Sequence, residues 1–128
     1  TANSIAPGDV VQAITVPANT KIVTAGIQVT ASATQNTGTD ATATLGTAVD
    51  ADEYVAAFDI DGAADGAYAP SATVASDVVI TTADTLDVTL AGSGASFTAG
   101  TLRVYAVMMD VSALGEMTAN EVDRDTLA

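Results

Sequence analysis

The clearest pattern in the chain is a strict alternation of apolar residues with polar or small ones over residues 23–32. A two-residue period is typical of a β-strand with one face on a core and the other in water. An earlier apolar run ends just before Pro17, which fixes φ and cannot donate a hydrogen bond to a neighbouring strand. The pattern therefore predicts a β-hairpin, with strands over Asp9–Val16 and Lys21–Ala33.

Later segments carry similar apolar patterns and are separated by short polar or glycine-rich turns. They are Asp40–Leu45, Val78–Thr82, Asp84–Ala91 and Thr101–Val111. In the last of them the residues of both parities are apolar, which is typical of a central strand that is covered on both faces. Six or more short strands with turns between them predict an all-β fold, an antiparallel β-sandwich or jelly roll.

Residues 51–60 depart from the two-residue period. Tyr54 and Phe58 are four positions apart, as on one face of a helix, and Asp50 with Glu53 resembles an N-terminal capping box. This spacing predicts one short helix, or a helical connection, over an open end of the sandwich. A strand through the same residues is the competing interpretation.

The residues after Ser112 leave the strand pattern and mix acidic side chains with isolated apolar ones. We therefore divide the chain into a β-sandwich domain over residues 1–112 and a C-terminal tail over residues 113–128, which a partner would order. The apolar residues of this tail are predicted to contact that partner. They are Leu114, Met117, Val122 and Leu127.

The charge balance excludes several classes of partner. Sixteen acidic residues are set against three basic ones, which gives a net charge of −13. Nucleic-acid binding and attachment to an anionic membrane both need clustered basic side chains, so we expect neither. The sequence also contains no apolar run long enough to span a bilayer.

The residue types needed for catalysis are scarce. The chain contains no histidine and no cysteine, which removes the usual general base and all thiolate chemistry. The glycine-rich stretch over residues 92–100 lacks the Lys-Ser/Thr ending of a phosphate-binding loop. We therefore expect a protein that is not an enzyme and that uses no cofactor.

One acidic cluster has the chemistry of a calcium site. Asp59, Asp61 and Asp65 lie around a glycine turn, and Ca²⁺ prefers carboxylate and other oxygen ligands. Their spacing does not match the calcium loop of an EF-hand, because Ala63 stands at the fifth position. We expect a solvated acidic loop without a metal, with these three residues as the weak candidate for a calcium site.

Three segments together resemble small virion proteins of tailed bacteriophages. They are a strand–VPANT–strand unit over Ile14–Ser32, an acidic segment over Thr42–Asp61 and a closing strand over Gly100–Ser112. The family comprises capsid decoration (cement) proteins and related structural proteins with jelly-roll or β-sandwich domains. The similarity covers most of residues 9–112, and its motifs describe a scaffold with no catalytic residues.

The resemblance implies a partner and a location. Such a protein would sit on the outer capsid surface of a virion and bind the major capsid protein, which it would stabilise. It would form a homo-oligomer, with a trimer favoured. A phage tail or fibre-associated module, or a cell-surface carbohydrate-binding module, is the alternative function.

The polar face of the alternating stretch is the predicted interface of the folded domain. Thr24, Gln28, Thr30 and Ser32 are all uncharged, although the chain as a whole is strongly acidic. A simply solvated face would be expected to share that acidic character. We therefore predict that this face lies against another subunit or a covering loop.

Overall fold

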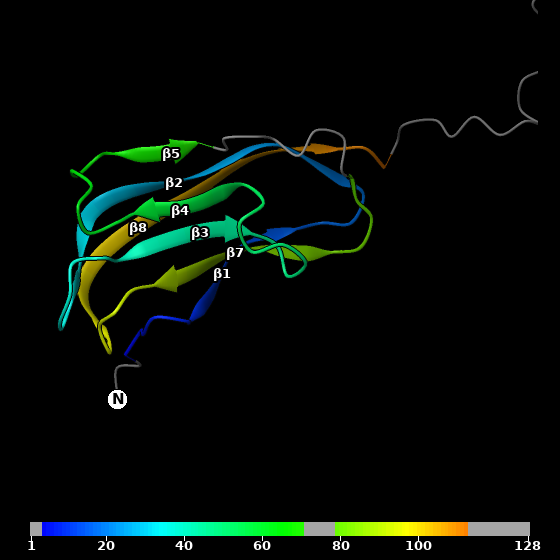
Figure 1. The fold of residues 1–128 in the computed structure, drawn as a ribbon. Helices are drawn as coiled ribbons and strands as arrows, with labels where there is room; N and C mark the ends of the chain where they lie inside the picture. The colour runs from blue at the N-terminus through cyan, green and yellow to red at the C-terminus, as the bar shows by residue number, and fades with distance from the viewer. Residues whose placement is uncertain (1–3, 71–78, 113–128) are drawn as a thin grey trace, which may run out of the picture.

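The computed structural model describes residues 4–70 and 79–112, and within these ranges every regular element is a β-strand. The predicted all-β class is confirmed, and two antiparallel sheets pack face to face as in a β-sandwich (Figure 1). None of the described residues forms a helix that is long and apolar enough to cross a membrane. In chain order the strands are β1 (Val10–Val16), β2 (Thr20–Gln35), β3 (Thr42–Gly46), β4 (Val55–Asp59), β5 (Tyr68–Pro70), β6 (Val79–Ile80), β7 (Asp84–Ala91) and β8 (Phe97–Asp110).

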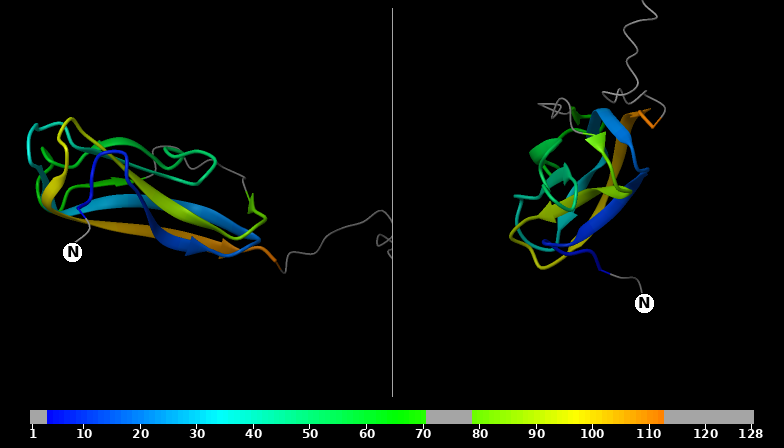
Figure 2. Two further views of the ribbon diagram at one scale, coloured as in Figure 1. Left: turned by 90° about the horizontal axis from the view of Figure 1, so that it is seen from below. Right: turned by 90° about the vertical axis from the view of Figure 1, so that its right-hand side faces the viewer.

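The two sheets differ in their organisation. One sheet, which we call the β7 sheet, has the strand order β1-β7-β3-β4. The other, the β2 sheet, is built around β2, which pairs with β8 along one edge and with β5 and β6 along the other. β2 and β8 are the longest strands and run side by side over most of their length, as Figures 1 and 2 show.

The core between the sheets consists mainly of small and branched aliphatic side chains. The alternation in β2 directs Ala25, Ile27 and Val29 inward, and none of the three has any exposed surface. Leu45 and Leu86 of the β7 sheet belong to the same cluster and are equally buried. Full burial of one such large aliphatic side chain contributes about 1.5–3 kcal/mol, so this interior supplies the main stabilisation of the sandwich.

The predicted hairpin between the first two strands is wrong. β1 pairs with β7 in one sheet, β2 pairs with β8 in the other, and the two do not pair with each other. The turn between them includes Asn19, which has a φ of 56°, and this turn carries the chain from one sheet to the other. Val16 and Thr20 flank the turn and are both buried, so it is anchored in the core.

The predicted short helix over residues 51–60 is also wrong, and the competing strand interpretation is confirmed by β4. β4 carries one more residue than β3 between the pairs that Val55 and Phe58 form, which is a β-bulge. The bulge brings these residues, three positions apart, onto one face, and this spacing imitates a helix. The carbonyl of Asp50 lies in a turn, where it accepts a 2.8 Å hydrogen bond from the N–H of Thr47.

The last strand is not the covered central strand that its sequence predicts. Among the described strands β8 pairs only with β2, so it forms an edge of the β2 sheet. Its outward side chains are accordingly open to solvent, and Val107 and Met109 are 52% and 50% exposed. The apolar residues on both faces of β8 therefore need another explanation than burial in the middle of a sheet.

A hydrogen-bonded cluster around Asp40 fixes one end of the sandwich. One carboxylate oxygen of Asp40 accepts bonds from the N–H and the hydroxyl of Ser93, both 2.9 Å long, and from the side-chain amide of Gln35 at 3.1 Å. Gln35 in turn accepts a 2.8 Å bond from the N–H of Gly94. These bonds tie the end of β2 to the turn between β7 and β8, and they lower the pKa of Asp40, with the Ser93 N–H as the largest cause.

We expect Asp40→Asn to lower the melting temperature at pH 7. The folded pKa of Asp40 lies below the unfolded value of about 4, so its contribution is complete above pH 4 and is lost as the pH falls through the folded value. The difference in melting temperature between the two proteins should therefore narrow between pH 4 and pH 2. Thermal unfolding followed by circular dichroism tests this, and a difference that stays constant over that range would contradict it.

Candidate interaction surfaces

The outer face of the β2 sheet gathers side chains from three strands. Residues that lie directly opposite each other in a sheet share a face, and the inward positions of β2 are those of the core. Strand pairing places β5, β2 and β8 residues in two neighbouring outward rows, Tyr68, Gln28 and Arg103 in the first, and Pro70, Gly26 and Tyr105 in the second.

The two tyrosines of these rows meet above Gly26. A β-carbon at Gly26 would lie 2.6 Å from Cζ of Tyr105, so the end of this ring rests directly on the glycine backbone. The ring centroids of Tyr68 and Tyr105 are 6.3 Å apart and the ring planes are tilted by 57°, a favourable arrangement for aromatic pairs. Burial raises the pKa of Tyr105, as does the neighbouring Tyr68 to a smaller extent, so the Tyr105 side chain favours the neutral phenol.

Polar side chains beside the tyrosines are held by one another. The guanidinium of Arg103 donates a 3.4 Å hydrogen bond to the side-chain oxygen of Gln28. The amide nitrogen of Gln28 donates a bond of the same length to the carbonyl of Gly66. The first row is thus oriented, while Tyr68 keeps 59% of its surface exposed.

An apolar strip continues from the tyrosines along the same sheet. Val107 lies opposite Thr24, and Met109 lies opposite Lys21, which also pairs with Val79 of β6. We call the whole surface the tyrosine face. It comprises Gln28, Tyr68, Arg103, Tyr105, Val107 and Met109.

The tyrosine face differs in charge from the rest of the chain. The strands of the β2 sheet contain no Asp or Glu apart from Asp110, the last residue of β8. Lys21 and Arg103, the two basic residues within the described ranges, both belong to this sheet. A neutral to weakly positive surface therefore lies on a chain whose net charge is −13.

The four predicted interface residues of β2 differ in their surroundings, and two of them, Gln28 and Ser32, bond to the loop between β4 and β5. Thr24 and Gln28 lie on the tyrosine face or next to it. Register shifts follow Val29, and the hydroxyl of Thr30 donates a 3.1 Å bond to a β8 carbonyl, that of Thr101. Ser32 is engaged by the loop between β4 and β5, where its hydroxyl donates a 2.7 Å bond to the carbonyl of Ala63.

The structure does not bring the three carboxylates of the candidate calcium site together. Asp59 accepts bonds from the N–H groups of Asp61 and Gly62, at 3.2 and 2.7 Å. Asp61 accepts a 3.0 Å bond from a third segment, at the N–H of Ala41, while Asp65 accepts one of the same length from Ser32. Each carboxylate thus fixes a different part of the backbone, and the described residues contain no group of three acidic side chains placed to hold a metal.

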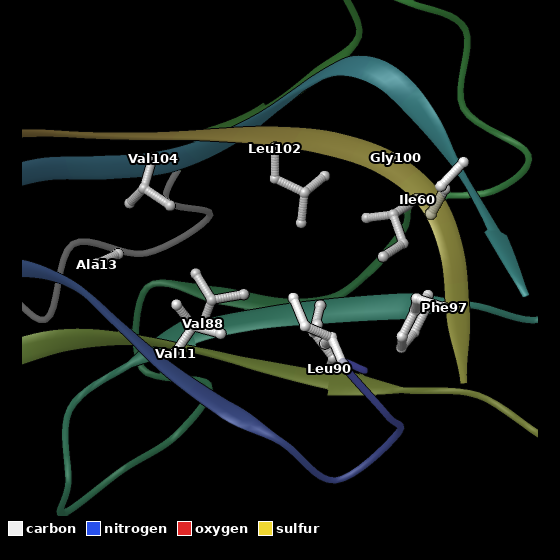
Figure 3. A pocket seen from close by; sticks show the side chains of 12 residues that line it. Val11, Ala13, Ile60, Val88, Leu90, Phe97, Gly100, Leu102 and Val104 are labelled. Carbon is white, nitrogen blue, oxygen red and sulfur yellow. The ribbon is translucent and has the colours of Figure 1, made fainter. Parts of the chain in front are cut away.

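A second apolar surface lies on the flank of the sandwich. β1 and β8 are edge strands of opposite sheets, and between them runs a groove of about 410 Å³ without a charged or polar side chain in its lining (Figure 3). Phe97 and Gly100 line it near the start of β8. We call it the flank groove. The side chains that face one another across it include Val11, Ala13, Val88, Leu90, Leu102 and Val104.

Sequence patterns alone did not reveal these surfaces. Tyr68 and Tyr105 come from distant strands, and nothing near either residue signals that they meet. The predicted contact residues of the tail, Leu114, Met117, Val122 and Leu127, lie outside the described residues.

Comparison with known protein families, with curated protein sequences and with solved structures yields no match to this chain.

Proposed function

We propose that this protein is a non-enzymatic structural component of a virion. It binds the major capsid protein on the outer surface of the shell and stabilises the shell as a decoration protein. The proposal rests on the resemblance of the strand–VPANT–strand unit, the acidic segment and the closing strand to such proteins. The jelly-roll connectivity typical of them remains a prediction.

The observation that carries the proposal is the tyrosine face. Protein-binding surfaces are enriched in Tyr, Met and Arg and depleted of acidic residues at their centre, and this face has that composition. Its position on the outer face of the β2 sheet leaves it accessible to a large partner such as a capsid shell. The acidic loops around the face would repel nonspecific acidic surfaces, and they favour a partner with a basic rim.

Repetition of the shell lattice strengthens such a contact. An oligomer that engages several capsid subunits at once turns each later contact into an intramolecular event, so weak single contacts give high occupancy. A rigid β-domain loses little conformational freedom on binding, which also favours affinity. The protein would then stabilise the shell by bridging neighbouring capsid subunits.

We expect Tyr68→Ala to weaken shell binding at least tenfold, because exposed aromatic side chains are among those that dominate the binding energy of an interface. The measurement is co-sedimentation with empty shells assembled from the major capsid protein of the same virus. Val10→Ala is the matched control, since Val10 is 57% exposed against 59% for Tyr68 but belongs to the opposite sheet. Failure of the unsubstituted protein to co-sediment with the shells would overturn the proposal.

The tyrosine pair also favours carbohydrate binding as the second candidate function. Sugars stack on exposed aromatic rings and take hydrogen bonds from neighbouring amide and guanidinium groups, which Gln28 and Arg103 supply beside Tyr68 and Tyr105. The same co-sedimentation assay distinguishes the two candidate functions. Displacement of the protein from shells by soluble oligosaccharides would favour the carbohydrate-binding module over the decoration protein.

A further inference from the structure

The free edge of β8 is the least protected feature of the fold. β8 spans Phe97–Asp110, and along the edge away from β2 no described strand pairs with it. Within the described residues, the N–H of Phe97 at the start of this edge donates a 2.8 Å bond to the carbonyl of Ile5. An edge strand with unpaired N–H and C=O groups is a template for another strand.

Monomeric proteins usually protect such an edge from pairing with another chain. The common devices are a short strand, a proline, several lysines or an inward-pointing charge. β8 is 14 residues long, contains no proline, and has Arg103 as its sole charge before Asp110. The edge therefore has the properties of a strand that pairs with a partner.

The flank groove beside this edge has an apolar lining, so a chain that covered it would bury apolar surface. Leu102 and Val104 point from β8 into the groove, opposite Val11 and Ala13 of the edge strand β1 (Figure 3). A strand added to the free edge of β8 would project alternate side chains over this apolar opening. An occupant must therefore offer both an open backbone edge and apolar residues at every second position.

We propose that the occupant is β8 of a second copy, paired antiparallel across a two-fold axis at Val104. In this register Val104 lies opposite the partner's Val104, and Leu102 lies opposite the partner's Ala106. On the outer face Arg103 lies opposite the partner's Tyr105. Over the groove a larger side chain thus meets a smaller one.

Charge favours a second copy at this edge and selects the register. Two chains of net charge −13 repel each other, so they can associate closely only where acids are absent, and β8 is free of them from Phe97 to Met109. A two-fold axis one residue earlier would place Arg103 opposite the partner's Arg103, which is unfavourable. The same surface patch serves both copies, so the assembly closes as a dimer, in place of the trimer that the resemblance implies.

The tail fits this edge less well than a second copy does. Residues 113–128 contain five charged side chains, and their apolar residues do not fall at every second position. A strand drawn from them would place charge over an apolar groove. The second copy supplies the alternation that the groove needs, through Leu102, Val104 and Ala106.

This proposal goes beyond shell attachment and is tested without a shell. In light scattering the purified chain of 128 residues should have twice its mass of 12.6 kDa. We expect Val107→Asp, at a position 52% exposed on β8, to weaken the dimer at least tenfold by adding an acid to its interface. Val23→Asp, at a 39% exposed position on β2 away from the free edge, should change the dimer dissociation constant less than threefold. A monomeric or trimeric mass for the unsubstituted protein would overturn the proposal.

A cross-linking experiment tests the register independently of the strength of the dimer. The chain has no cysteine, so Val104→Cys carries a single thiol. Directly opposed residues of antiparallel strands have Cα atoms about 4.5–5.5 Å apart, which suits a disulfide. Oxidation should therefore convert most of this variant to a covalent dimer, and less than a tenth of Ala106→Cys, whose thiols lie about 13 Å apart in the same register. Equal cross-linking of both variants, or of Ala106→Cys alone, would refute the register.

Discussion

Gly46→Ala is expected to lower the free energy of unfolding by about 3 kcal/mol, near the upper end of what overpacking costs. Gly46 ends β3, is buried, and lies under the turn that leads to β4. An added β-carbon would collide with the carbonyl oxygen of Asp50 and lie 2.5 Å from the carbonyl carbon of Ala51. Both obstacles are backbone atoms, so a side-chain rotation cannot relieve the collision.

The cost of this substitution arises because the displaced turn is itself packed. The turn is held by the bond from the N–H of Thr47 to Asp50 and by a 2.9 Å bond from the N–H of Tyr54 to the carbonyl of Leu45. Tyr54 is 4% exposed, and burial, followed by the nearby charges of Glu53 and Asp84, raises its pKa to about 12. Lifting the turn would expose this ring and break both bonds.

Denaturant unfolding measures the effect, with Gly66→Ala as the control. A β-carbon at Gly66 would meet no atom within 4 Å, but the residue has a φ of 91°, which costs alanine about 1 kcal/mol. The control therefore separates collision from backbone strain. If Gly46→Ala destabilises the protein no more than Gly66→Ala, the packed turn does not have the rigidity that we assign to it.

Local alternation found most of the strands but not their partners. The boundaries of β7 match the predicted Asp84–Ala91, because apolar and polar residues alternate there without interruption. The same pattern in β1 and β2 could not tell a hairpin from a crossing between two sheets. That choice depends on the buried turn after Val16, and on contacts with β7 and β8 that are distant in sequence.

β-bulges explain why the sequence pattern was misleading in β4 and in the second half of β2. The extra residue in β4 brings Phe58 onto the same face as Val55, and Tyr54 just before the strand is buried as well. Tyr54 and Phe58 therefore have a helical spacing without forming a helix. The shifts after Val29 likewise interrupt the alternation that assigned Ser32 to the same polar face as Thr24 and Gln28. A two-residue period holds only while the register is continuous.

The candidate surfaces depend on long-range pairing to a greater degree than the fold class does. The sequence indicated a neutral surface near Gln28, since no acidic residue lies close to it in β2. It could not place Tyr68 and Tyr105 on that surface, because their approach follows from the pairing of β2 with both β5 and β8. The sequence shows clearly that β8 has apolar residues at both odd and even positions, but it does not show that β8 lies at the edge of a sheet.

Gly26→Ala is the second substitution with a large expected effect, and it acts on the tyrosine face. A β-carbon at Gly26 would lie 2.5 Å from the carbonyl oxygen of Ala69 on β5 and 2.6 Å from Cζ of Tyr105. One obstacle is therefore fixed backbone and the other is a movable ring. We expect the free energy of unfolding to fall by about 2–3 kcal/mol, as overpacking typically costs.

A double-mutant cycle with Tyr105→Ala separates these two obstacles. Removing the ring abolishes one collision and leaves the other, so the double variant should be more stable than the sum of the single effects predicts by about 1 kcal/mol. Denaturant unfolding of the four proteins gives this coupling energy directly. The remaining loss measures how firmly β5 is held against β2.

The outcome of this cycle determines how the tyrosine face is built. Strong coupling means that Gly26 is the seat of the Tyr105 ring, and that the ring's orientation toward Tyr68 follows from the missing side chain. Additive effects would show instead that the ring moves freely, and a face of mobile rings would bind a flat partner at a higher entropic cost. Because a β-carbon at Gly26 would point away from the core, the coupling energy reports on the contact with Tyr105 and not on the packing between the two sheets.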